Sequence, residues 1–311
     1  MKKISIVVPV YNEEGNIEKL TEEIWSNVPD RFNYELIFIN DGSTDKTEKT
    51  INLLCSRDKR IKLLNFTKNY GHEIAMSAGM DVAKGDSVIF MDGDLQHPPS
   101  LLPKLINEWE NGVKIVLTKR MNNTDKSFFY NICASFYYKV LNHLCEHDMK
   151  TNTPDFRLID RYYIEILKKF KESSRLFRGL LYIINAENDT KTIEFIAPKR
   201  YSGKTKYNFF KLMNLAIDSI LAFSIRPLRI ALFFSITLFF LSILFGLYFL
   251  LEWFFYGNDA PGFMTLLLTI TILGSSNLFV LSVIGEYIGR IHMESKNRPL
   301  YTIKSVVNLN G

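Results

Sequence analysis

Two aspartates separated by one glycine follow a short apolar run, and this spacing is suited to binding a metal ion. Asp92 and Asp94 flank Gly93 directly after residues 88–91, Val-Ile-Phe-Met. A tight bend at a strand end would turn both carboxylates toward one hard cation. Mg²⁺ or Mn²⁺ held in this way keeps coordination positions open for phosphate oxygens and stabilises a departing diphosphate. The triplet therefore predicts a metal site, with a solvated turn as the alternative interpretation.

The period of the apolar residues predicts the elements that position this triplet. Strand-like runs alternate with stretches such as 17–24 and 51–54, in which apolar residues have helical spacing. The strand-like runs are residues 4–8, 35–39, 61–66, 87–91 and 114–117. This alternation predicts an α/β fold, with a mostly parallel sheet covered by helices on both faces.

Polar residues gather directly after three of the predicted strands. Residues 11–14 follow the first strand, Asp41, Ser43 and Asp45 the second, and the Asp92 triplet the fourth. In sheets of this kind ligands bind at the carboxyl ends of the strands, so we expect one site there. The chain lacks GxGxxG and GxxxxGK[ST], which removes the main support for a dinucleotide-binding or P-loop function.

Composition excludes several broad classes of protein. The chain has 311 residues, of which 47% are hydrophobic and 14% aromatic, so a disordered chain is excluded. Lys and Arg number 38 against 33 Asp and Glu, an excess too small to predict a nucleic-acid partner. Cys55, Cys133 and Cys145 form no CxxC pair, which argues against a disulfide framework or a zinc cluster and favours a reducing cytosol.

Two long segments without charge predict transmembrane helices. Residues 230–251 and 260–285 would extend about 33 and about 39 Å as helices, enough to cross a hydrocarbon core of about 30 Å. Their basic flanks predict that both ends face the cytoplasm and that the short acidic loop 252–259 lies outside. These flanking residues are Arg226, Arg229, Arg290, Lys296, Arg298 and Lys304. No signal peptide is expected, because the apolar run 4–10 is short and contains Ser5 and Pro9.

Several motifs taken together resemble the family 2 glycosyltransferases with a GT-A fold. The matching stretches are residues 6–14 (IVVPVYNEE), 40–45 (NDGSTD) and 91–99 (MDGDLQHPP). Four further stretches resemble the polyprenyl-phosphate glycosyltransferases, namely bactoprenol glucosyltransferases and relatives of dolichyl-phosphate mannose synthase. They are residues 155–161 (DFRLIDR), 200–207 (RYSGKTKY), 285–290 (GEYIGR) and 298–301 (RPLY). The resemblance covers nearly the whole chain. It departs from the commonest pattern at Asn40, where Asp is frequent, and at Gly93, where Ala is frequent.

The resemblance implies that a hexose passes from a nucleotide sugar to a polyprenyl phosphate such as undecaprenyl phosphate. The transfer would be inverting and would depend on Mg²⁺ or Mn²⁺. UDP-glucose is the first choice of donor, with UDP-GlcNAc and GDP-mannose as alternatives. The implied metal-site residues are Asp92, Asp94 and Gln96, and Asp94 is also implied to be catalytic. The implied donor-site residues are Pro9, Tyr11, Glu13, Asp41 and Gly93. Arg120, Arg200 and Lys206 are implied to meet donor or acceptor phosphates, with solvated surface charges as the other interpretation.

A phosphate acceptor changes what the site must do. A phosphate monoester has its second pKa at about 6, so near pH 7 it is already largely dianionic and serves as its own nucleophile. The site must instead offset the repulsion between two phosphate-bearing substrates, which requires the metal and cationic side chains. Asp155 is therefore expected to be a positioning residue or a base, and a structural role of the turn at residues 155–157 is an equal alternative.

A lipid acceptor predicts that the catalytic domain lies at a membrane surface. Residues 209–225 have the pattern of an amphipathic interface helix, and 175–181 could form a second, with packing against the sheet as the alternative for both. The expected organisation is a cytosolic catalytic domain at 1–225, a transmembrane hairpin at 226–290 (spans at about 230–251 and 262–285), and a cytosolic tail at 291–311. The protein would then be integral to the bacterial cytoplasmic membrane, with both termini cytoplasmic. The sequence does not determine the oligomeric state, and a homo-oligomer is one alternative.

Two other functions are alternatives to this one. A processive polysaccharide synthase of the same family would carry a QxxRW motif, which is absent because Gln96 is the sole glutamine and is followed by His-Pro-Pro-Ser. A noncatalytic membrane scaffold that binds a nucleotide sugar is the rival from a different class. The presence of Asp41, Asp92, Asp94 and Gln96 argues against the scaffold.

Overall fold

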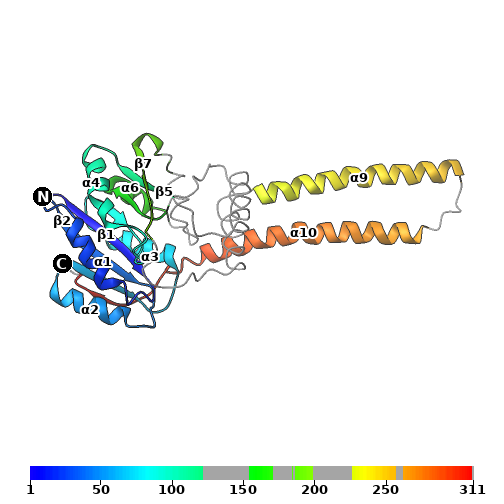
Figure 1. Ribbon diagram of the computed structural model, residues 1–311. Coiled ribbons are helices and arrows are strands. Elements are labelled where there is room, and N and C mark those ends of the chain that lie inside the picture. Colours follow the sequence, from blue (N-terminus) through cyan, green and yellow to red (C-terminus); the bar gives the residue numbers. More distant parts are fainter. Residues whose placement is uncertain (122–153, 171–183, 185, 199–225, 257–261, 310–311) are drawn as a thin grey trace. The chain divides into compact units, whose positions relative to one another are not determined.

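The computed structural model describes residues 1–121, 154–170, 184, 186–198, 226–256 and 262–309 (Figure 1). The chain divides into two compact units. Among the described residues, 1–121, 154–198 with its gaps, and 299–309 belong to the first unit, and 226–298 with its gap to the second. Each unit is described by itself below.

The first unit is built on an eight-stranded sheet with the order β7-β5-β6-β4-β1-β2-β3-β8 in the described part of the chain. Its strands are β1 (Lys3–Val10), β2 (Asn33–Asn40), β3 (Ile61–Phe66), β4 (Ser87–Phe90), β5 (Ile115–Arg120), β6 (Arg157–Asp160), β7 (Thr190–Phe195) and β8 (Ile303–Val307). The central strands β3, β2, β1 and β4 run parallel. The α/β class with a mostly parallel sheet is confirmed, and each of the five expected strands is present within a few residues.

Helices cover both faces of the sheet, and alternate residues of the strands explain why. Ile6 and Val8 of β1 face α1 (Ile17–Asn27), α2 (Thr47–Arg57) and α4 (Leu102–Glu110), while Val7 faces α3 (His72–Val82) and α6 (Arg161–Leu167). Because both faces are buried, the strands are nearly continuous apolar runs rather than alternating ones. Short 3₁₀ turns occupy Pro99–Leu101 and Glu187–Asp189.

Helix α3 lies unusually close to the central strand. A Cβ atom placed on Gly79 would be 2.2 Å from Cγ1 of Val7, far inside van der Waals contact. Only a glycine permits this approach. Helix α3 begins directly after the loop that contacts the site described below. The packing of α3 on β1 therefore sets how far that loop extends over the sheet.

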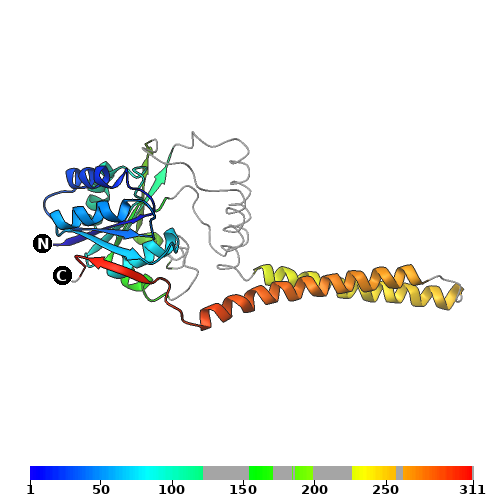
Figure 2. The same cartoon turned by 90° about the horizontal axis from the view of Figure 1, so that it is seen from below.

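Three strands were not expected from the sequence. β6 and β7 follow the fifth predicted strand, and β6 pairs antiparallel with both β4 and β5. The region expected as a tail contains the end of a long helix and then β8, which pairs antiparallel with β3 (Figure 2). The last described residues are thus part of the sheet of the first unit.

A cluster of buried charged residues links the strands of this sheet near their amino-terminal ends. Glu35 on β2 is 1% exposed and forms ion pairs with Lys3 (2.7 Å) and Lys62 (2.8 Å). It also accepts hydrogen bonds from the Ser5 hydroxyl (2.6 Å) and the backbone N–H of Lys84 (2.8 Å). The first three strands are therefore tied together at the edge opposite their carboxyl ends.

The second unit contains the two apolar helices. α9 (Arg226–Tyr256) and α10 (Phe263–Ser295) run side by side, as both views show, and Phe234 meets Phe279 at a ring distance of 6.3 Å (Figures 1 and 2). Both are long and apolar enough to cross a membrane, over Leu228–Tyr248 and Thr269–Ser295. Hydroxyls within them, such as those of Ser235 and Ser282, donate to carbonyls one turn back, so these polar groups are satisfied inside the helix.

Candidate active site

The polar residues predicted to form a site lie where the parallel strands end. β1 ends at Val10, β2 at Asn40 and β4 at Phe90. The backbone N–H of Asp41 donates to the carbonyl of Val10 (2.9 Å), which joins the first two ends. The loops that follow these strands carry the candidate residues, as expected for ligand sites in such sheets.

The loop after β4 places the two aspartates of the triplet differently. Asp94 is 8% exposed, and its Oδ1 accepts the backbone N–H of Gln96 (3.0 Å). Leu95 has a φ of 61°, which gives the loop its sharp bend. Asp92 is more open, yet its Oδ1 is buried and accepts no hydrogen bond among the described residues. This oxygen retains unused capacity for a cation.

His97 orients Asp92. Its Nδ1 accepts the backbone N–H of Asp92 (2.9 Å), and its Nε2 lies 3.5 Å from Oδ2 of the same residue. The imidazole is buried and stacks on Phe156 with a ring distance of 5.1 Å, while Phe195 meets it edge-on at 6.4 Å. The ring therefore has little freedom to turn away.

Antiparallel pairing brings the start of β6 beside the end of β4. Phe90 and Arg157 are register partners, so residues 155–157 reach the Asp92 loop. Asp155 is 4% exposed and its Oδ1 is ion-paired with Arg157, which is itself 2% exposed. The same guanidinium donates to the carbonyl of Pro154 (3.1 Å). The carboxylate of Asp155 is thus held rigidly by a buried cation.

His72, the first residue of α3, lies between the two carboxylates. Its Nε2 is 3.4 Å from Oδ1 of Asp92 and 3.5 Å from Oδ2 of Asp155. Burial alone would lower the pKa of His72, but the hydrogen bond to Asp155 and the charge of Asp92 outweigh it and raise the pKa to about 9. His72 therefore carries a positive charge near neutral pH in this arrangement.

Asp41 is bound to the loop that precedes α3. Its Oδ1 accepts the backbone N–H of Tyr70 (2.6 Å) and its Oδ2 that of Gly71 (2.9 Å). Burial raises the pKa of Asp41, and these two hydrogen bonds and the nearby His72 oppose the rise. Each oxygen keeps a second lone pair, so the carboxylate can still accept a hydrogen bond from a ligand.

The loops after β1 and β2 are fastened to each other. The side chain of Asn12 accepts the backbone N–H of Thr44 (2.8 Å), and the backbone N–H of Asn12 donates to Ser43 (3.0 Å). The Glu13 carboxylate accepts from the Asn16 amide (2.6 Å). Pro9 is buried within β1 and Tyr11 is half-buried just after it, so both lie at this joined edge.

The remaining predicted residues fall into two groups. Arg120 ends β5, and its Nε is buried without a hydrogen-bond partner among the described residues. Arg200 and Lys206 lie outside the described residues, as do the segments 175–181 and 209–225. Three residues that sequence reasoning missed, His72, His97 and Arg157, surround the aspartates. The sequence offered only two hints of the histidines: the chain has only 5 of them, and His97 directly follows the predicted ligand Gln96.

The side chains at the Asp92 loop fit a divalent cation that takes some of its ligands from outside the protein. No group of three or more His, Cys, Asp or Glu side chains in the described ranges forms a complete metal cage. A catalytic Mg²⁺ or Mn²⁺ does not need one, since it uses one or two carboxylates and takes its other ligands from water and phosphate. The buried Oδ1 of Asp92, which accepts no hydrogen bond from any residue that the structure describes, fits that requirement together with Asp94.

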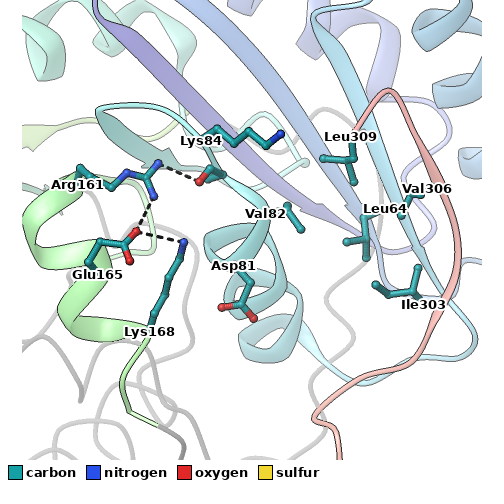
Figure 3. A pocket seen from close by; sticks show the side chains of 11 residues that line it. Leu64, Asp81, Val82, Lys84, Arg161, Glu165, Lys168, Ile303, Val306 and Leu309 are labelled. Atoms are coloured by element: carbon teal, nitrogen blue, oxygen red, sulfur yellow. Dashed lines mark hydrogen bonds and ion pairs between the residues drawn. The ribbon is translucent and has the colours of Figure 1, made fainter. Parts of the chain in front are cut away.

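A separate cavity of about 560 Å³ lies near the carboxyl end of α3 (Figure 3). Its charged lining is largely paired internally, because Glu165 binds both Arg161 (3.1 Å) and Lys168 (3.3 Å). Leu64, Ile303 and Val306 form part of its apolar wall. None of the residues predicted to bind donor or metal lines it.

Comparison with known proteins identifies the family. The glycosyl transferase family 2 pattern matches residues 5–167. The chain is 38% identical over 306 residues to the bactoprenol glucosyl transferase of Shigella phage SfV, covering 97% of this chain and 98% of that protein. It is 37% identical over 310 residues to the prophage bactoprenol glucosyl transferase homolog of Escherichia coli K12, covering 98% and 99%.

A solved structure shares the fold. It is glucosyl-3-phosphoglycerate synthase from Mycobacterium tuberculosis in complex with Mn²⁺, UDP-glucose and phosphoglyceric acid. The TM-score is 0.51 at 19% identity, covering 71% of this chain and 78% of that one. The fold, the grouped aspartates and the near full-length relatives agree: this chain belongs to glycosyl transferase family 2 and is a glycosyltransferase.

Proposed function

We propose that this enzyme transfers a hexose, with UDP-glucose as first donor, to a polyprenyl phosphate at the cytoplasmic face of a membrane. The observation that carries the proposal is the loop after β4, where Asp94 and a buried oxygen of Asp92 that accepts no hydrogen bond from the described residues and faces His72 at 3.4 Å lie at the carboxyl edge of the sheet. Two near full-length relatives named for bactoprenol and two helices long enough to cross a membrane support the lipid acceptor.

Asp92 and Asp94 would hold Mg²⁺ or Mn²⁺, with Gln96 as a further candidate ligand. When bound, the cation supplies positive charge to the diphosphate of the leaving nucleotide. The M. tuberculosis enzyme was solved with Mn²⁺ and UDP-glucose, which supports a divalent cation for this fold. Gly93 lets this turn pack tightly against β1, since a Cβ there would be only 2.9 Å from Cγ1 of Val10.

The joined loops after β1 and β2 would receive the nucleoside. Pro9, Tyr11, Glu13 and Asp41 all lie along this edge. The crosslinks between the loops keep the edge in one conformation, so little ordering entropy is lost when a ligand binds. We therefore assign base and ribose recognition to these four residues.

Asp155 acts in this proposal as a positioning residue rather than as a base. Its carboxylate is buried, ion-paired with Arg157 and 3.5 Å from His72, an arrangement that uses its negative charge to order two cations. The acceptor phosphate needs no base, because it is already ionised near pH 7. Arg120, Arg200 and Lys206 are assigned to donor or acceptor phosphates, since cations must offset the repulsion between them.

The two apolar helices would anchor the enzyme with both chain ends in the cytoplasm. Basic residues flank the pair, and the short connection at 252–259 carries only acidic charges. We propose the organisation of catalytic domain 1–225 and hairpin 226–290, with residues 291–311 returning to the catalytic side.

The test is a transfer assay with the full chain in lipid nanodiscs. Undecaprenyl phosphate, Mn²⁺ or Mg²⁺, and labelled UDP-glucose, UDP-GlcNAc or GDP-mannose are supplied. We expect wild-type protein to form lipid-linked glucose only when the metal is present. The transfer rate should be at least about 100-fold lower in Asp94→Asn, because the metal loses a negatively charged ligand. Asp30→Asn, the same change at an exposed site, should be unaffected. Intact UDP binding without a lipid-linked sugar from any donor would instead support the scaffold.

A further inference from the structure

The chain that follows α10 returns to the catalytic unit and contacts the loop beneath the proposed donor site. Tyr301 and Thr302 lie just before β8, which Figure 2 shows in red along the sheet edge. They meet the connection between β3 and α3, residues 67–71, called the 67–71 loop here. No residue of this C-terminal segment was among the predicted site residues.

Thr302 makes three contacts with the 67–71 loop. Its carbonyl accepts the backbone N–H of Thr67 (3.1 Å), and its Oγ1 is 2.5 Å from the Thr67 hydroxyl. The same Oγ1 is 2.6 Å from the hydroxyl of Tyr70. One side chain therefore joins the beginning of the loop to a residue near its end.

Tyr301 contacts both elements that flank this loop, β3 and α3. Its ring stacks on Phe66, the last residue of β3, with a ring distance of 5.0 Å and an interplanar angle of 26°. Its hydroxyl donates to Asp81 on α3 (3.2 Å). Phe66 in turn meets Tyr70 edge-on at 5.5 Å. The segment is thus packed against the loop, its preceding strand and its following helix.

The 67–71 loop is what orients two residues of the site. Its backbone N–H groups at Tyr70 and Gly71 hold both oxygens of Asp41, and it leads directly into His72. The loop also lies against the turn after Asp41 so tightly that a Cβ on Gly42 would be 2.4 Å from the carbonyl carbon of Lys68. A shift of the loop must therefore move the Asp41 turn with it.

We infer that Tyr301 and Thr302 are positioning residues for the sugar-nucleotide site, acting through the 67–71 loop on Asp41 and His72. The inference rests on the proposed function, because it assumes that Asp41 meets the donor. Without the Thr302 hydroxyl the loop samples more conformations, and binding the donor must then order it again. The consequence is weaker donor binding, with a smaller effect on turnover of the bound donor.

The experiment compares Thr302→Val, Thr302→Ser and Tyr70→Phe in the full chain. We measure the Kd for UDP with Mn²⁺ by calorimetry, and KM and kcat in the transfer assay. Thr302→Val and Tyr70→Phe each remove the partly solvated contact between these two hydroxyls, and each should raise Kd and KM about three- to tenfold. Thr302→Ser keeps the hydroxyl and should behave as wild type. The double variant should lose less than the product of the two single effects, since both single variants remove the contact between the Tyr70 and Thr302 hydroxyls.

A matched control separates this role from general docking of β8. Asn308, beyond the other end of β8, donates to the carbonyls of Cys55 and Ile61 (2.9 Å each), so its side chain is bound at α2 and the start of β3 rather than at the 67–71 loop. Asn308→Ala should lower the unfolding temperature and leave Kd and KM unchanged. Equal effects of Asn308→Ala and Thr302→Val on Kd would overturn the inference. So would wild-type Kd in Thr302→Val, or equal loss in Thr302→Ser.

The two proposals fail in different ways. If wild-type protein binds UDP but transfers no sugar to polyprenyl phosphate, the proposed function is wrong, while the Kd comparison still decides the role of Thr302. If wild-type protein transfers sugar and Thr302→Val has the same Kd and KM, only the positioning role is wrong. If wild-type protein binds no UDP, the inference falls together with its premise.

Discussion

His97 holds Asp92 at two points. The backbone N–H of Asp92 donates to Nδ1 of His97 at 2.9 Å, and Nε2 of the same ring lies 3.5 Å from Oδ2 of Asp92. Since Nδ1 accepts, a neutral ring carries its proton on Nε2 and presents it to the carboxylate. The ring is 4% exposed, so backbone and side chain of the proposed metal ligand are set by one buried residue.

Replacing His97 should weaken metal binding more than catalysis at saturating metal. His97→Phe keeps an aromatic ring to stack on Phe156 but loses both contacts to Asp92. Loss of a group that orients a metal ligand typically lowers metal affinity about 10- to 100-fold. The half-saturating Mn²⁺ concentration for UDP binding and for transfer should rise by that amount. His292→Phe on α10 is the control, and unchanged Mn²⁺ dependence in His97→Phe would refute the role.

Asp155→Asn should reduce stability more than turnover. The variant leaves the Arg157 guanidinium, 2% exposed, without its anionic partner, and such a loss typically costs about 3–5 kcal/mol. We expect a lower unfolding temperature, a fall in kcat of less than about tenfold, and a kcat-pH profile of unchanged shape. A general base contributes about 100- to 10,000-fold. A loss in that range together with a missing acidic limb of the profile would show that Asp155 is a base.

Gly79→Ala should destabilise the catalytic unit, and a second substitution should repair it. The new methyl would collide with Cγ1 of Val7, and overpacking of this kind typically costs about 1–3 kcal/mol. Val7→Ala removes the colliding atom, so the double variant should be more stable than the sum of the single effects predicts. Thermal unfolding of the full chain measures this. Gly289→Ala on α10 has open space around it and is the control; additive effects of the pair at 7 and 79 would contradict the close approach.

The Glu35 cluster predicts a defined acid sensitivity of the fold. Burial alone would raise the pKa of Glu35, but Lys3, Lys62, Ser5 and the backbone of Lys84 lower it from 4.5 to about 2. Since the folded pKa lies below the unfolded one, the carboxylate stabilises the fold fully above about pH 5. That contribution, about 3 kcal/mol for a shift of this size, is lost as pH falls from about 4.5 toward 2.

Glu35→Gln should therefore be less stable than wild type at pH 7, and the difference should shrink below about pH 4.5. Thermal unfolding across this pH range measures it. Glu194→Gln breaks an exposed ion pair with Lys119 (3.1 Å) and should cost less than about 1 kcal/mol at any pH. A gap between Glu35→Gln and wild type that stays constant down to pH 2 would mean that the cluster does not lower the pKa of Glu35.

Much of the central fold could be predicted from local patterns. The strands β1 to β5 are buried on both faces over most of their length. A strand of that kind is a nearly unbroken run of apolar residues, which can be recognised in the sequence of that segment alone. Ile17, Leu20 and Ile24 are buried on one side of α1 as their spacing indicated. The edge strands β7 and β8 and the interior strand β6 escaped prediction because the identity of each depends on the neighbours with which it pairs.

The residues of the candidate site also fall into those that local sequence predicted and those that it did not. Asp92 and Asp94 were recognisable because their spacing and their place after a strand are local properties of the chain, and the apolar helices were recognisable from length and composition. The neighbours of the aspartates were not: His72, Arg157 and Thr302 are brought near the site by the start of α3, the antiparallel pairing of β6 with β4, and the return of β8 to β3. Local sequence thus determined which residues could bind a metal ion and which segments could cross a bilayer. Only the tertiary structure decided what orients those residues, because hydrogen bonds and ion pairs across strands depend on registers that no single segment contains.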